Sequence, residues 1–201
     1  VVPFAAQAVF PAHGEQYFLI KQAKYAEIDS NEYVYFALEH APTPARVREL
    51  SKLAWEQRIK GLRPEETAKL MAKMAPGLTK GQIKRIARTE TAKAGALLTQ
   101  ARCQDLGIKW YVWRSAQDER VRDAHRNMNG VYVRWDDPPN PEAIFGGHDS
   151  GTHYHPGGIY NCRCVALPVV DERDLLFPCR VYANGSVRSV SNIKAFQSLK
   201  G

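Results

Sequence analysis

The chain has 201 residues, of which 44% are hydrophobic, and this is enough for one domain of ordinary size with a filled core. It contains no apolar run of about eighteen residues, which argues against a membrane-spanning helix. Four cysteines are too few for the disulfide framework of a small secreted protein, so we expect reduced or metal-bound thiols.

The positive charge is concentrated in the middle of the chain. The net charge is +7, and residues 41–110 carry fifteen Lys and Arg against six Asp and Glu. Such an excess is typical of a surface that meets nucleic acid or an acidic protein, and equally of a solvated helix face.

Residues 1–29 show no steady hydrophobic period and are interpreted as an N-terminal arm that docks on neighbouring subunits. The arm lacks the basic segment of a secretory signal. Because the chain does not begin with Met, we interpret its start as processed, truncated or incomplete.

Residues 30–107 are predicted to form a helical basic region. A short helix is expected to end near Glu39, and three longer helices follow. Pro44 and Pro64 stand where a proline favours the first turn of a helix. Thr79 and Gln82 have the spacing of a capping box, which predicts the start of the third helix.

The third helix is predicted to carry much of the basic surface. Its candidate contacts with nucleic acid or a protein partner are Lys80, Lys84, Arg85, Arg88 and Lys93. Glu90 falls on the apolar stripe of the same helix, so we expect it to be partly buried and paired with Arg88 or an arginine of the sheet.

Residues 108–190 are predicted to form a small antiparallel β-sheet unit. Runs of β-branched and aromatic residues predict strands over 108–113, 131–135 and 162–170, and Asn184-Gly185 predicts a hairpin turn. Asp118 is expected to cap a short helix over 119–128, and residues 136–161 are expected to be a long loop rich in Gly, Pro and His. The fold class is therefore α+β, with helices first, then the sheet, and a C-terminal tail over 191–201.

Cys162 and Cys164 lie one residue apart, so an extended backbone would place both thiols on one side. With His125 and His155 they make a candidate four-ligand set for tetrahedral zinc. The alternative that the residues leave open is a pair of hydrogen-bonded free thiols beside packed histidines.

Two coupled blocks of this sequence resemble the Mu F-like phage head morphogenesis (minor head protein) family. The first block comprises Arg88-Thr-Glu90-Thr91, Trp113 and Asp118-x-Arg120-Val-Arg122-x-x-His125. The second block comprises His155-Pro156 and Asn161-Cys162-Arg163-Cys164. The resemblance covers about residues 80–170.

The resemblance implies a structural protein of the virion, present in the host cytoplasm during assembly. Its expected partners are the portal protein, other capsid proteins and packaged DNA, bound without sequence specificity, and no membrane. A minor capsid protein near the portal vertex would help to build the head and to package DNA. No catalytic residue is expected.

Some members of that family carry cysteines at the positions of Arg122 and His125. The arginine here cannot bind a metal, so a polar network is as natural as a zinc site. We expect a structural clasp, with or without zinc, that ties the short helix and the loop to the Cys-Arg-Cys segment. Its candidate members are Asp118, Arg120, Arg122, His125 and Arg163.

Two other functions compete with the capsid role. The basic excess would suit a non-specific DNA-binding protein, although no recognition-helix motif accompanies it. An enzyme or a toxin-associated domain is less favoured, because His125 and Cys162 lack the context of a known nucleophile and no phosphate-binding loop is present.

Overall fold

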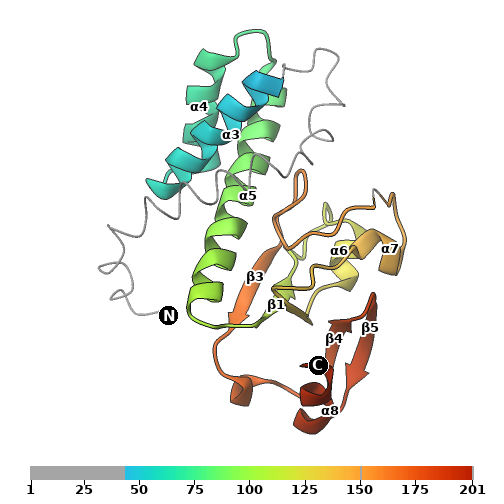
Figure 1. The fold of residues 1–201 in the computed structure, drawn as a ribbon. Helices are drawn as coiled ribbons and strands as arrows, with labels where there is room; N and C mark the ends of the chain where they lie inside the picture. The colour runs from blue at the N-terminus through green and yellow to red at the C-terminus, as the bar shows by residue number, and fades with distance from the viewer. Residues whose placement is uncertain (1–43, 150, 201) are drawn as a thin grey trace.

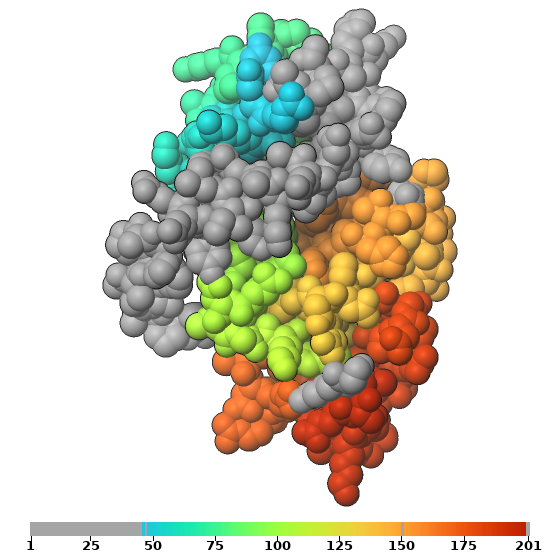
Figure 2. Space-filling model, in the orientation of Figure 1, coloured from blue at the N-terminus to red at the C-terminus, as the bar shows by residue number. Residues whose placement is uncertain are grey.

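The structure is a computed structural model that describes residues 44–149 and 151–200. The expected arm over 1–29 and the expected helix ending near Glu39 lie outside these residues. Figure 1 shows a group of helices at one end and a sheet at the other, and Figure 2 shows the same order from blue-green to red. Within the described residues, no helix combines the length and the hydropathy needed to span a bilayer.

Three helices make the first end: α3 (Pro44–Ile59), α4 (Pro64–Met74) and α5 (Lys80–Asp105). Their shared core includes Leu50, Met71 and Ile86, each at most 1% exposed, with one residue from each helix. The three helices predicted from the sequence are confirmed. Burial of one apolar face of each helix against the others supplies most of their stability, as is usual for helices in proteins.

The start of α5 follows from its capping box. The Thr79 hydroxyl accepts from the Gln82 N–H at 3.3 Å, and the Gln82 side chain accepts from the Thr79 N–H at 2.7 Å. Two backbone donors that the helix itself cannot pair are thereby satisfied. This prediction is confirmed.

A five-stranded sheet forms the second end, in the order β3-β1-β2-β4-β5. The strands are β1 (Trp110–Arg114), β2 (Val131–Arg134), β3 (Val165–Val169), β4 (Cys179–Ala183) and β5 (Ser186–Val190). The α+β class and the hairpin turn at Asn184-Gly185 are confirmed. The expectation of a wholly antiparallel sheet is wrong at one pairing, because β2 and β4 run parallel. A parallel pair needs a long crossover, which residues 135–178 supply.

Side chains alternate across β1 and fill two separate cores. Tyr111 and Trp113 pack on one face with the two cysteines of the Cys-Arg-Cys segment, whereas Trp110 packs on the other face with Phe196. Both faces of the sheet are covered, and Trp110, Trp113 and Trp135 are all buried.

Several boundaries differ from those predicted. The third strand begins at Val165, and the cysteines lie in the irregular segment before it. The short helix α6 (Asp123–Asn127) begins after Arg122, so Asp118 does not cap it. The long loop contains an unexpected helix, α7 (Pro141–Phe145), whose first turn is capped by Asn140. Two single turns, η2 (Glu172–Asp174) and η3 (Ser198–Lys200), complete the described elements.

The C-terminal segment belongs to the fold. Helix α8 (Ile193–Gln197) places Phe196, 0% exposed, with its ring centroid 4.6 Å from that of Trp110. Part of the segment expected to be a C-terminal tail over 191–201 is therefore structured, and its Phe196 side chain fills the protein's own core.

Candidate functional site

Helix α5 supports the segment that carries the two cysteines. The Thr89 hydroxyl accepts a hydrogen bond from the Asn161 N–H at 3.0 Å. A Cβ placed on Gly157 would lie 3.3 Å from both the Ala92 carbonyl oxygen and the Ala96 Cβ, so the loop lies directly on the helix. Gly157 also has φ +83°, a conformation that glycine adopts without strain.

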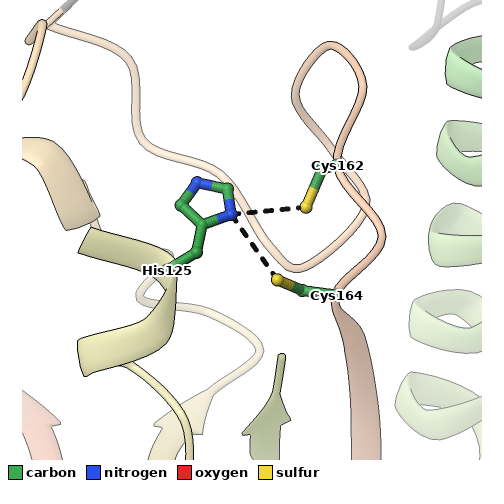
Figure 3. Close-up of side chains that lie close together, drawn as sticks. All are labelled: His125, Cys162 and Cys164. Carbon is green, nitrogen blue, oxygen red and sulfur yellow. Dashed lines mark hydrogen bonds between the residues drawn. The ribbon is translucent and has the colours of Figure 1, made fainter. Parts of the chain in front are cut away.

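His125 and the two cysteines meet at the centre of the site (Figure 3). The His125 Nδ1 atom lies 3.5 Å from the Cys162 Sγ atom and 3.5 Å from the Cys164 Sγ atom. The three side chains are buried, with exposures of 2%, 3% and 5%. Among the described residues, this is the group of His, Cys, Asp and Glu whose ligand atoms converge closely enough to hold a metal ion.

The other ring nitrogen of His125 faces a buried polar pair. Its Nε2 atom lies 2.8 Å from the Tyr154 hydroxyl and 3.3 Å from a Glu142 carboxylate oxygen. The Tyr154 hydroxyl donates to the other Glu142 oxygen at 2.5 Å. Because the Tyr154 proton goes to Glu142, the hydroxyl oxygen is left to accept from the Nε2–H of His125.

Burial and hydrogen bonding shift the protonation of these groups. Burial alone would lower the pKa of His125, but hydrogen bonds to Cys162 and Glu142 outweigh it and raise the pKa to about 8. The pKa of Cys162 is lowered well below its usual value by hydrogen bonds from Cys164 and His125. The pKa of Cys164 is raised, because it donates to Cys162 and is desolvated. One thiolate beside a charged imidazole is therefore favoured in the metal-free protein.

Two contacts join the same segments nearer the surface. The Arg163 guanidinium makes a two-pronged ion pair with Asp118, one arm at 2.6 Å, and lowers the pKa of that carboxyl group. Arg122 donates to the Tyr160 carbonyl oxygen at 3.1 Å and lies 4.3 Å from the Tyr160 ring centroid. We call these contacts, together with the buried group, the clasp.

Arg120 contributes to the clasp mainly through its backbone, since its N–H donates to Asp118 at 3.0 Å. The structure thus brings together the predicted clasp residues around the Cys-Arg-Cys segment. The surface pairs are partly exposed and each contributes little to stability, so the buried part dominates.

His155 was predicted as the fourth metal ligand, and the structure contradicts this. Its Nδ1 atom lies 2.9 Å from the Tyr111 hydroxyl and its Nε2 atom lies 3.4 Å from the Gln100 amide nitrogen. The ring also packs edge-on against Trp135, with centroids 5.2 Å apart. Burial lowers the pKa of His155 to about 4, as expected for a neutral core histidine.

The basic residues of α5 divide into two groups. Lys80, Lys84, Arg85 and Arg88 are exposed, as a contact surface requires. Lys93 is only 6% exposed and lies 3.6 Å from Glu90, so its expected contact with DNA or a partner is wrong. The expected burial of Glu90 is confirmed, since the residue is 0% exposed; it accepts from the Ser51 hydroxyl of α3 at 2.8 Å and pairs with Lys93.

The sequence predictions missed Glu142 and Tyr154. The run Asn140-Pro141-Glu142 is a usable signal, because Asn caps helices, Pro favours the first turn and Glu suits the positive end of the helix dipole. No pattern in the sequence points to Tyr154, which contacts His125 only because the loop folds back over α6.

Comparison with known proteins identifies relatives for part of the chain. A family model described as Phage Mu protein F like protein matches residues 52–167, and a model described as a domain of unknown function matches residues 2–67. An uncharacterized protein of Haemophilus influenzae is 39% identical over 89 residues, which are 44% of this chain and 17% of that protein. The chain thus spans less than a fifth of that relative. No solved structure matches.

Proposed function

The chain belongs to the Phage Mu protein F like family, and on this premise we propose that it is a minor capsid protein that helps to build the phage head. The observation that carries the proposal is the extent of the match. Residues 52–167 include the basic face of α5 and both segments that the clasp joins, residues 118–125 and 160–164. Within this role, we further propose a position near the portal vertex and a part in DNA packaging.

A structural role is favoured over an enzymatic one by the burial of the reactive groups. His125 and Cys162 would be the obvious base and nucleophile, yet they are 2% and 3% exposed. A substrate would have to open the clasp to reach them. We therefore propose that the clasp holds the sheet unit rigid as an assembly part.

The exposed basic face of α5 is the proposed contact with the portal protein. Lys80, Lys84 and Arg88 are spaced four residues apart and so share one side of the helix. Such a row attracts an acidic protein surface over the range of the Debye length. The same row favours the second candidate function, non-specific binding of DNA.

One experiment separates the two partners. The chain is mixed with the portal protein of the phage or prophage that encodes it, and separately with duplex DNA, at low and at physiological salt. The capsid role predicts retention by the portal protein at physiological salt, with loss of binding in the triple variant Lys80→Glu, Lys84→Glu, Arg88→Glu. The control is Lys69→Glu with Lys73→Glu, which reverses exposed lysines of α4.

Retention by DNA alone would favour the second function and count against the portal contact. The proposed location in the virion is tested by mass spectrometry of purified particles. A chain that stays in the host cytoplasm and never enters particles would overturn the capsid role.

A further inference from the structure

The buried group of His125, Cys162 and Cys164 carries an inference that does not depend on the capsid role. We propose that the Nδ1 atom of His125 and the two Sγ atoms bind a zinc ion. The three ligand atoms lie within 4.8 Å of one another and come from two segments that are 37 residues apart in the sequence. Zinc would therefore crosslink helix α6 to the irregular segment before β3.

The distances fit a tetrahedral metal site. With Zn–S of about 2.3 Å and Zn–N of about 2.0–2.1 Å, tetrahedral angles place the nitrogen and each sulfur about 3.6 Å apart. The two observed separations from His125 Nδ1 are both 3.5 Å. Figure 3 shows both sulfur atoms directed at the same ring nitrogen.

Hydrogen bonding alone explains this arrangement less well. A neutral Nδ1 atom has one lone pair and a protonated one has one N–H, so a single hydrogen bond to one sulfur is satisfied at a time. The second sulfur at the same distance gains nothing comparable from the ring. A metal ion between the three atoms interacts with all of them at once.

The other side of the imidazole has the partners that zinc-bound histidines usually have. Such a histidine donates its second N–H to a carboxylate or another acceptor, which fixes the tautomer and the ring orientation. Here Nε2 faces the Tyr154 hydroxyl at 2.8 Å and Glu142 at 3.3 Å. When zinc replaces the Nδ1 proton of the charged imidazole, the lone pair of Nδ1 would face the ion and the two sulfurs.

The sulfurs are also prepared to carry negative charge. The Gly157 N–H donates to the Cys162 Sγ atom at 3.4 Å, a contact that stabilises a thiolate. Two thiolates and an imidazole select zinc over magnesium or calcium, which prefer oxygen ligands. Three protein ligands leave one position of the tetrahedron for water.

Metal binding has a defined proton balance. Two Zn–S bonds and one Zn–N bond form, and two protons leave in total. The number is the same whether the metal-free state holds two thiols with a neutral imidazole, or one thiol and one thiolate with an imidazolium. Titration calorimetry in buffers of different ionisation enthalpy measures this number directly. Release of no protons on zinc addition would overturn the assignment of the ligands.

The main test is metal analysis of the reduced full chain, purified without chelator, incubated with zinc and desalted. We expect about one zinc per chain in the wild type and in Cys179→Ser, whose buried thiol lies in the other core. We expect loss of zinc in Cys162→Ser and Cys164→Ser. A metal-free wild type, or equal loss in Cys179→Ser, would overturn the proposal.

A second measurement covers the case in which these variants fail to fold. Cobalt added to the wild-type chain should give the thiolate charge-transfer absorption of a tetrahedral site, and zinc should displace it. An intact mass that lacks two hydrogens and carries no metal, together with a proteolytic peptide in which Cys162 and Cys164 are joined, would show a disulfide between them and would also overturn the proposal.

Discussion

The carboxylate of Glu142 lies 3.3 Å from the Nε2 atom of His125, on the side of the imidazole away from the two sulfurs. Hydrogen bonds from His125 and Tyr154 outweigh burial and lower the pKa of Glu142. Glu142 therefore stays ionised and orients the ring. It acts on the site through His125 and so is a positioning residue.

Glu142→Gln is expected to weaken zinc binding by about 10- to 100-fold, because the neutral amide is a poorer acceptor for Tyr154 and His125. Competition with a chromophoric chelator measures the change in the zinc dissociation constant. Glu119→Gln, an exposed change near α6, is the control and should leave the constant unaltered. Equal affinities in both variants would contradict the role of Glu142.

Gly157→Ala is expected to destabilise the protein by about 2–5 kcal/mol, the sum of left-handed backbone strain and overpacking. The new methyl group would lie 3.3 Å from both Ala92 and Ala96 atoms of α5. Gly61→Ala is the matched control, because its φ is +81° and nothing lies within 4 Å. Urea unfolding of Gly61→Ala should show an unfolding free energy lower by about 1–2 kcal/mol, because this variant adds backbone strain without overpacking. Equal losses would mean that the loop does not press on the helix.

Ser51→Ala is expected to lower the free energy of unfolding by about 1.5–3 kcal/mol, because it removes a hydrogen bond to a buried carboxylate. The bond from Ser51 to Glu90 is 2.8 Å long and joins α3 to α5. The exposed change Ser189→Ala should have no measurable effect. Denaturant titration of both variants compares them, and a neutral Ser51→Ala would show that the contact contributes nothing.

The neutral state of His155 predicts a pH dependence. The imidazole of the unfolded chain takes up a proton near pH 6.5, whereas burial delays this to a pKa of about 4 in the folded protein. Between these values the unfolded state binds more protons, so stability present above pH 6.5 is lost as the pH falls towards 4.

The expected loss is up to about 3 kcal/mol, from 1.36 kcal/mol for each pKa unit. His155→Asn keeps an acceptor for the Tyr111 hydroxyl but does not titrate. The difference in unfolding free energy between wild type and His155→Asn should therefore shrink as the pH is lowered from 7.5. A difference that stays constant down to pH 4 would contradict a buried neutral imidazole.

Local signals predicted the helices and the hairpin well. The capping box at Thr79 and the turn at Asn184-Gly185 depend on contacts between neighbouring residues, so a few consecutive residues are enough to predict them. Asn140-Pro141 is equally local, and α7 could have been predicted from it. Its neighbours Gly146 and Gly147 made the segment resemble a loop.

Contacts between distant residues could not be predicted in the same way. The parallel pairing of β2 with β4 depends on the path of the 135–178 crossover, which no spacing reveals. His155 and Tyr154 are adjacent, yet they bind different partners, Tyr111 and His125. Which of two neighbouring side chains enters the site depends on the backbone of the loop, and composition alone does not define it.

Helix α5 runs without a break from the three-helix end to the sheet. At about 1.5 Å per residue its 26 residues span about 39 Å. Ile86 packs in the core of the three helices, and Cys103 packs in the sheet core that contains Cys162 and Cys164. A pull or twist exerted on the exposed face near Lys84 would be transmitted along this strut to Thr89 and the loop it supports. A partner that binds one end of the molecule would thus rotate both ends together as one rigid body.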